Sequence, residues 1–176
     1  MTNARFNVFV LSIYPTSRGF AFVLFEGPAS PFDWGTKEFR GRHKNMQTLR
    51  AVAAIIDRYR PEVLVIEDFT VKGSRRSSRI RKLYRALTHL AETEQVDVQR
   101  ISRTQVRLCF ASVGATTKHE IAMAIAKQIL ALAHRLPRTR KIWMSEDPRQ
   151  NLFDAAAIGL TYFANCTGND HPMPLA

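Results

Sequence analysis

The sequence holds little of what a disulfide-bonded, zinc-binding or membrane-spanning protein requires. Its two cysteines, Cys109 and Cys166, are far apart and belong to no metal-ligand spacing. No apolar run approaches the roughly 20 residues that a membrane-spanning helix needs. The apolar stretch at 6–13 is short and continues into Tyr-Pro-Thr without a cleavage-like site, which predicts a strand rather than a signal peptide. We therefore expect a cytoplasmic protein with no membrane partner.

The sequence also lacks the motifs of several enzyme classes. Its five histidines are dispersed and form no H-x-x-x-H pair, and no glycine-rich phosphate loop of the Walker type occurs. No serine or cysteine stands in a nucleophile motif. These enzyme classes are therefore not expected.

Acidic residues are also few, and this shortage is informative. Lys and Arg total 26 against 15 Asp and Glu, which gives a formal net charge of +11. A domain this basic is expected to meet a polyanion, and nucleic acid is the commonest one. General solubility charge and attraction to an anionic membrane surface are the alternatives. The length of 176 residues and the hydrophobic fraction of 45% fit one compact domain rather than a disordered chain.

The order of apolar runs and amphipathic segments predicts an α/β layer domain. Strands at 6–13, 19–25 and 34–39 are expected to form an antiparallel meander, and later strands should add in parallel at its side. We expect the domain to span 1–164 and the tail at 165–176 to be loose. The later elements are expected at 45–59 (a helix capped by Asn45), 63–66 (a strand), 78–93 (a helix), 96–101 (a buried strand), 104–110 (a short helix capped by Thr104), 117–134 (a long helix started by Thr116 or Thr117) and 151–163 (a last helix).

A first candidate site residue, Glu67, stands where the apolar strand at 63–66 ends. The carboxyl ends of parallel strands form the functional edge of open α/β sheets, which makes Glu67 a candidate for chemistry. It could equally be an ordinary solvated acid. Asp68 should point to the opposite face, because side chains alternate along a strand.

A second candidate, Asp154, lies in the first turn of the last predicted helix, three residues after Asn151. This helix is apolar nearly all round, so the carboxylate could point into a site. Alternatively, Asn151 is the N-cap and Asp154 completes a capping box. Glu146 and Asp147, in the preceding loop, could reach the same place.

A basic segment follows Glu67 directly. No acidic residue occurs between Arg75 and Leu90 to pair with it. Such unpaired positive charge favours contact with phosphates over an ordinary solvated face. The candidate nucleic-acid-binding residues are Arg75, Arg76, Arg79, Lys82 and Arg85, with Lys118 at the start of the long helix as a further candidate.

Three segments together resemble the RuvC-like Holliday junction resolvases. The segment 12–19, Ser-Ile-Tyr-Pro-Thr-Ser-Arg-Gly, looks like their first-strand motif I-D-P-x-x-R-x-G. Val65-Ile66-Glu67 is similar to their second acidic strand, and 151–158 resembles their last helix, which carries carboxylates three residues apart. The resemblance covers about 7–163. It implies a ribonuclease-H-like fold, with a mixed five-stranded sheet flanked by helices.

The resemblance also implies hydrolysis of a phosphodiester by two metal ions, Mg²⁺ or Mn²⁺, held by carboxylates. Glu67 and Asp154 match the family's metal ligands. Tyr14 stands at the position of the first catalytic aspartate, and Asn151 stands at that of the earlier helix carboxylate. A neutral phenol with an ordinary pKa near 10 cannot bridge two metals. We therefore expect Mg²⁺ to be bound weakly or lost.

Two functions follow from the resemblance. The first is a protein that binds branched or duplex DNA and cleaves it weakly or not at all. The alternative is an active Mg²⁺-dependent endonuclease of the Holliday junction resolvase type with a rearranged metal site. The family further suggests a homodimer, whereas DNA and RNA are not distinguished by the residues. A nucleotide-binding domain of the actin and sugar-kinase type is disfavoured, because the chain is short and has no phosphate loop.

Overall fold

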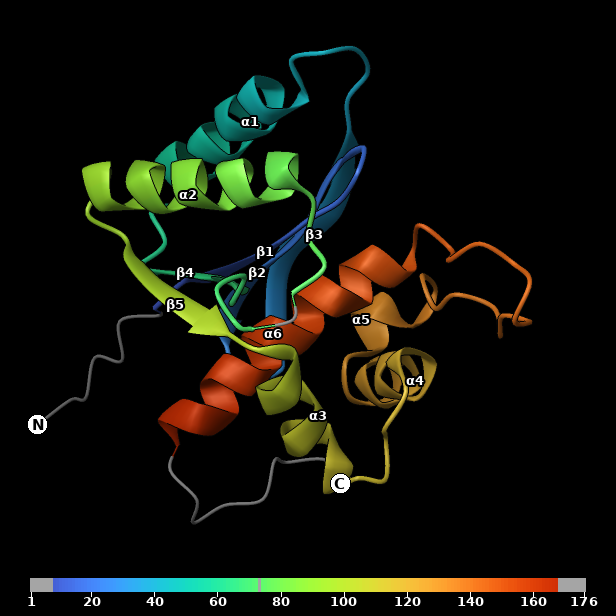
Figure 1. Cartoon of the computed structure of the whole chain (residues 1–176). Coiled ribbons are helices and arrows are strands. Elements are labelled where there is room, and N and C mark those ends of the chain that lie inside the picture. The colour runs from blue at the N-terminus through green and yellow to red at the C-terminus, as the bar shows by residue number, and fades with distance from the viewer. Residues whose placement is uncertain (1–7, 73, 168–176) are drawn as a thin grey trace, which may run out of the picture.

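A mixed sheet forms the centre of the protein. In the computed structural model, which describes residues 8–72 and 74–167, five strands join in the order β3-β2-β1-β4-β5 (Figure 1). β1 pairs antiparallel with β2 and parallel with β4, so the meander and the parallel additions meet at β1. This arrangement confirms the expected fold class. The strands are β1 (Val10–Pro15), β2 (Gly19–Gly27), β3 (Ser30–Glu38), β4 (Val63–Glu67) and β5 (Asp97–Ile101).

The burial of each strand follows its place in the sheet. All residues of β1 and β4 are buried, as their nearly continuous apolar sequences predict for strands covered on both faces. The expectation that β5 is a buried strand is wrong, since among its five residues Ile101 alone is buried. β5 lies at the edge of the sheet, where it has a neighbouring strand on one side.

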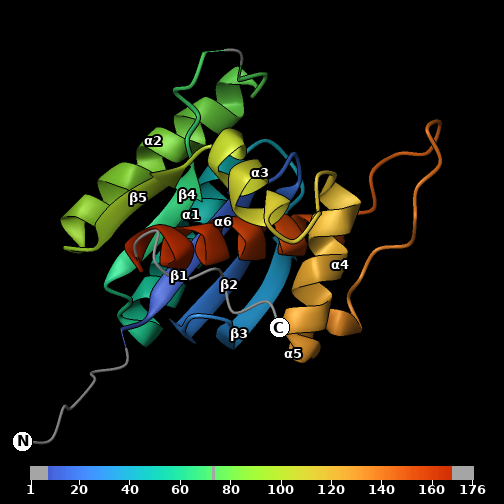
Figure 2. The same cartoon turned by 90° about the horizontal axis from the view of Figure 1, so that it is seen from below.

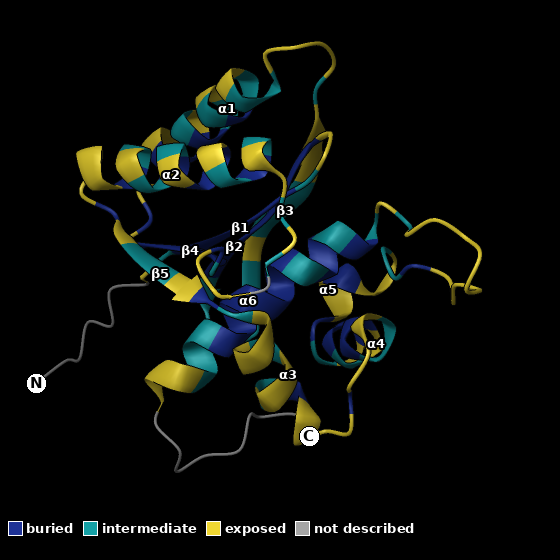
Figure 3. Ribbon diagram, in the orientation of Figure 1, coloured by how far each residue is buried: buried dark blue, intermediate teal, exposed yellow. Residues whose placement is uncertain are grey.

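Helices cover both faces of the sheet, as Figure 1 and the turned view in Figure 2 show. One core cluster joins Leu11 and Phe22 to residues of α1 and α2, and the other joins Val10 and Val23 to residues of α3, α4, α5 and α6. Figure 3 shows that α6 is largely buried, as are the strands β1, β2 and β4, whereas the edge strands β3 and β5 are largely exposed or half-buried. The helices are α1 (Lys44–Tyr59), α2 (Ser78–Thr93), α3 (Arg103–Ala111), α4 (Lys118–Gln128), α5 (Leu130–Ala133) and α6 (Gln150–Cys166).

The last helix, α6, packs tightly on the sheet. A Cβ added at Gly159 would lie 2.5 Å from Cε2 of Phe25 and 3.2 Å from Oγ of Ser12, so only glycine allows this approach. α6 continues three residues past the predicted end at Phe163, and the first two residues of the expected loose tail are therefore helical. The rest of that tail, from 168 onward, lies outside the described residues.

Several helix starts differ from those predicted. His43, not Asn45, precedes α1, because the Asn45 side chain is taken by a tertiary contact with Arg79. Ser102, not Thr104, caps α3, since its extended backbone lets its hydroxyl accept the amide of Gln105.

The long helix expected at 117–134 begins as predicted but is interrupted. Of the two threonines expected to start it, Thr117 caps α4 and forms a capping box with Glu120. The helix then breaks at Ile129, whose φ of −116° and ψ of 85° are not helical, so α4 and α5 are separate. In the described part of the chain, none of these helices combines the length and the apolar character needed to cross a membrane.

Candidate functional site

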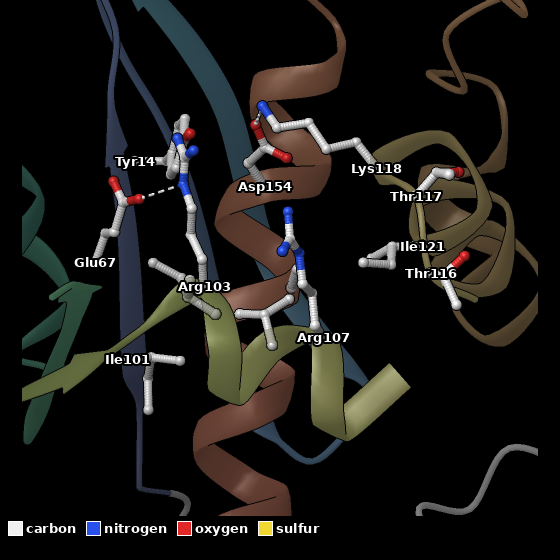
Figure 4. A pocket seen from close by; sticks show the side chains of 13 residues that line it. Tyr14, Glu67, Ile101, Arg103, Arg107, Thr116, Thr117, Lys118, Ile121 and Asp154 are labelled. Carbon is white, nitrogen blue, oxygen red and sulfur yellow. Dashed lines mark hydrogen bonds and ion pairs between the residues drawn. The ribbon is translucent and has the colours of Figure 1, made fainter. Parts of the chain in front are cut away.

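Three of the predicted site residues converge on one cavity at the carboxyl ends of β1 and β4. β1 and β4 run in parallel, with Ile13 opposite Ile66, so Tyr14 and Glu67 follow side by side at their carboxyl ends. Asp154 of α6 faces them across a cavity of about 270 Å³ (Figure 4). The structure thus brings these three predicted residues together, from two strand ends and the last helix.

Glu67 is buried and surrounded by hydrogen-bond donors. Its Oε2 accepts from Nε of Arg76 at 2.7 Å and from the hydroxyl of Tyr84 at 3.1 Å. Its Oε1 accepts from Nε of Arg103 at 2.9 Å. Burial raises the pKa of Tyr84 well above its ordinary value, so the phenol keeps its proton and donates. Both carboxylate oxygens are therefore already engaged by the protein itself.

Asp154 is engaged in the same way from another helix. Its Oδ2 accepts from Nζ of Lys118 at 2.9 Å, and its Oδ1 accepts from Nε2 of Gln150 at 3.2 Å. Burial raises the pKa of Asp154, and Lys118 and Gln150 act against that rise. Nζ of Lys118 also donates to Oε1 of Glu146 at 2.7 Å. Lys118 therefore joins the cavity to the loop before α6.

Tyr14 lies between the two groups of ion pairs. The guanidinium carbon of Arg76 is 4.6 Å from the centroid of its ring, and Nζ of Lys118 is 5.9 Å from the same centroid. Both distances are within the range of a cation–π interaction. Burial raises the pKa of Tyr14, so the ring is a neutral surface for these cations and supplies no oxyanion.

These residues do not fit a pair of divalent metal ions. Hard cations such as Mg²⁺ need several oxygen ligands, usually carboxylates. Across the described ranges 8–72 and 74–167, no three His, Cys, Asp or Glu side chains gather as a metal-binding group. The oxygens of Glu67 and Asp154 that would serve as ligands accept hydrogen bonds from Arg76, Arg103 and Lys118 instead.

The remaining candidates, at and just before the start of α6, differ in where they lie. Asn151 lies in the first turn of α6 but does not line the cavity. The alternative in which it caps α6 is wrong, because the helix already begins at Gln150 and Asp154 turns to Lys118. Glu146 does reach Lys118, whereas Asp147 pairs with Arg149 at 2.6 Å.

The predicted basic residues also fall into two groups. Arg76 holds Glu67, and Arg79 donates to Oδ1 of Asn45 at 2.8 Å and to the carbonyl of Thr16 at 3.1 Å. The others point to solvent: for the residues that the structure describes, no hydrogen bond or ion pair involves the exposed side chains of Arg75, Lys82 and Arg85.

The cavity is also lined by two arginines that were not predicted as site residues. Arg103 and Arg107 come from α3 and lie beside Lys118. Figure 4 shows the guanidinium of Arg107 pointing into the cavity, and within the described chain no carboxylate pairs with this group. Their i,i+4 spacing directly after the last strand is an available signal, because it places both on one helix face at the functional edge.

The comparisons with known proteins agree with this architecture. No protein-family model and no curated protein matches the sequence. A solved structure of Thermus thermophilus RuvC is similar, with 20% identity and a TM-score of 0.65 over 92% of this chain and 98% of that one. The T. thermophilus RuvC in complex with a Holliday junction substrate matches with 20% identity and a TM-score of 0.64, over 92% and 97% of the two chains. The chain therefore has the fold of the RuvC resolvases, as its sequence motifs predicted.

Proposed function

We propose that this protein binds branched or duplex DNA and cleaves it weakly or not at all. One observation carries the proposal: the two carboxylates at the functional edge are bound by Arg76, Arg103 and Lys118, beside a tyrosine where the family pattern has an aspartate.

The charge at the cavity supports binding over cleavage. Two-metal hydrolysis needs carboxylates that neutralise the incoming ions. Here Glu67 and Asp154 already neutralise cationic side chains, and Arg107 adds a further positive charge to the cavity wall. A divalent cation is repelled from such a site, whereas a backbone phosphate is attracted.

The surface beyond the cavity supports the choice of a nucleic acid. Arg75, Lys82 and Arg85 keep their charges exposed, and the chain as a whole carries a net charge of +11. The structurally similar T. thermophilus RuvC has been solved with a Holliday junction substrate, which makes a four-way junction the first ligand to test. Homodimerisation on such a two-fold symmetric ligand stays a prediction.

A gel-shift and cleavage assay on a four-way junction and a matched duplex, with Mg²⁺ or Mn²⁺, tests the proposal. We expect binding that weakens steeply with salt, and no cleavage. A triple variant, Arg75→Gln with Lys82→Gln and Arg85→Gln, should lower the affinity and reduce the salt slope by about 3, roughly one for each phosphate that is no longer neutralised.

The matched control removes the same charge elsewhere, with Lys37→Gln, Arg50→Gln and Lys127→Gln, all of which are exposed. Equal reductions of affinity in both triple variants would mean that overall charge, rather than the surface of α2, determines affinity. Absence of binding to either DNA would refute the function.

Cleavage by the unaltered chain would instead support the rearranged endonuclease. One observation favours this alternative: the ammonium group of Lys118 binds both Asp154 and Glu146, so a further carboxylate from the loop before α6 shares a partner with Asp154. Cleavage of that kind should disappear in Glu67→Gln and Asp154→Asn. Under the binding proposal, Tyr14→Asp also stays inactive, because Arg76 and Lys118 still occupy the neighbouring carboxylates.

A further inference from the structure

Bulky apolar side chains are exposed at the tip of the loop at 134–149, between α5 and α6. Ile142 is 94% exposed, Trp143 79% and Met144 51%. Figures 1 and 2 both show this orange segment extending away from the helices. Single exposed apolar residues are common, but a contiguous group on a projecting loop marks a contact with another molecule.

The flank of this apolar tip is positively charged. Arg138, Arg140 and Lys141 are exposed, and no acidic residue occurs in 134–145. Nζ of Lys141 lies 5.4 Å from the centroid of the Trp143 ring, so a cation already accompanies the aromatic surface.

The two acids that follow the tip do not balance this charge. Glu146 is bound by Lys118 at 2.7 Å, and Asp147 is bound by Arg149 at 2.6 Å. The outer part of the loop is therefore basic and apolar.

The loop is attached directly to the proposed DNA-binding site. Lys118 contacts Glu146 of the loop and Asp154 of the cavity with the same ammonium group. A second hollow, lined by Lys118, Arg138 and Arg140 among others, adjoins the cavity through Lys118 and Thr117. A nucleic acid seated at the cavity would thus have the loop beside it.

We propose that Trp143, flanked by Ile142 and Met144, stacks on an unpaired nucleobase of the bound DNA while Arg138, Arg140 and Lys141 hold its phosphates. The inference rests on the proposed DNA-binding function and adds what that function does not contain, a site for a base outside the duplex. Aromatic rings beside basic groups bind bases in this way, because every base has a π-face and every nucleotide a phosphate. Apolar side chains also enter between base steps as wedges.

Nucleic acid fits this tip better than the other occupants. A second copy of the chain would bring the same net charge of +11 against a basic loop, which opposes pairing. An anionic membrane surface would also complement the positive charge of the loop, but a flat membrane surface would not enter the hollow lined by Lys118, Arg138 and Arg140. Vesicles therefore serve as one arm of the test.

The experiment compares two DNA ligands that differ in one nucleotide. One is a plain duplex, and the other is the same duplex with a single unpaired 2-aminopurine. Trp34 is the second tryptophan, so a Trp34→Phe background leaves Trp143 as the reporter. We expect binding of the bulged DNA to quench both Trp143 and 2-aminopurine.

Affinities of the variants complete the test. Trp143→Ala should weaken binding of the bulged DNA by about 5- to 100-fold and binding of the plain duplex by less than about 2-fold. Trp143→Phe should keep most of the affinity because it keeps a ring. Leu130→Ala, which removes another exposed apolar side chain, should change neither affinity.

Each contrary outcome has its own meaning. If Trp143→Ala binds both DNAs as the parent does, or is weakened equally on both, the stacking role is refuted while DNA binding stands. If the parent binds neither DNA, the proposed function fails and the stacking role fails with it. A blue shift of Trp143 on anionic phosphatidylserine vesicles, without quenching by the bulged DNA, would assign the loop to a membrane surface instead.

Discussion

Replacing Glu67 by glutamine tests whether this carboxylate is held by internal cations or is reserved for metal ions. In a metal site without its ions, neighbouring carboxylates repel one another, and removing one charge is neutral or stabilising. In this protein Glu67 binds Arg76, whose side chain is 16% exposed, and Arg103, whose side chain is 63% exposed. We therefore expect Glu67→Gln to lower the free energy of unfolding, because the substitution leaves the charge of Arg76 without its partner.

The size of the effect follows from these exposures. Breaking a buried ion pair by removing one partner costs about 3–5 kcal/mol, and the loss of an exposed pair adds at most about 1 kcal/mol. Glutamine keeps one carbonyl oxygen that can still accept a hydrogen bond, so we expect the free energy of unfolding to fall by about 3 kcal/mol. For a chain of this size that lowers Tm by about 6–12 °C.

Urea unfolding at neutral pH, followed by circular dichroism, measures this change. Glu62→Gln is the matched control, since this exposed carboxylate precedes the same strand, and its replacement should change stability by less than about 0.5 kcal/mol. Adding Arg76→Gln to Glu67→Gln should restore part of the stability, because the charge of Arg76 is then removed together with its partner. If Glu67→Gln is as stable as the parent or more so, the reasoning about internal cations is refuted.

Two further predictions concern the framework of the site. Gly159→Ala should lower the free energy of unfolding by about 1 kcal/mol in urea, because overpacking against Phe25 outweighs the better helix propensity of alanine; an unchanged stability would show that the Phe25 ring yields. The amides of Thr116 and Thr117 lower the pKa of Glu120 from 4.5 to about 2, so its contribution to stability is present above about pH 4.5 and is lost as the pH falls through 2. The difference in Tm between Glu120→Gln and the parent should therefore shrink across that window, and a constant difference would contradict the assigned pKa.

The parts of the site that the sequence predicts are those set by strand order. The apolar run of β4 ends on Glu67, and the apolar helix α6 carries Asp154 in its first turns. Because both elements and β1 belong to one sheet and its covering helix, their ends are brought together by topology alone. The positions of Glu67 and Asp154 could thus be predicted without knowledge of side-chain contacts, whereas Tyr14 is singled out only by the resemblance of 12–19 to the first-strand motif of the RuvC-like resolvases.

The partners of these carboxylates could not be predicted in this way. The sequence favours DNA phosphates as the partners of Arg76, because no acidic residue occurs between Arg75 and Leu90, and Lys118 is a further candidate for such contacts. Their partners in the structure are remote: Glu67 is 9 residues from Arg76, and Asp154 is 36 residues from Lys118. Which cation meets which acid depends on rotamers and on how helices cross the sheet, and neither leaves a periodic pattern in the sequence. Contacts of these two residues with DNA stay a prediction.

Local capping shows the same division. The helix start predicted at Thr116 or Thr117 is confirmed at Thr117, which forms a capping box with Glu120 three residues later. Asn45 has a strong intrinsic preference for a cap, but a tertiary contact with Arg79 takes its side chain. The intrinsic preference of a residue for a capping position determines the helix start only where no distant group binds its side chain.

The cations that bind Glu67 and Asp154 belong to the same polypeptide as the carboxylates. A bound ion dissociates when its concentration falls below its dissociation constant, and a chelator removes it. A tethered lysine or arginine cannot be diluted, because its effective concentration is set by the fold. The neutralisation of these two acids is therefore independent of the supply of divalent ions.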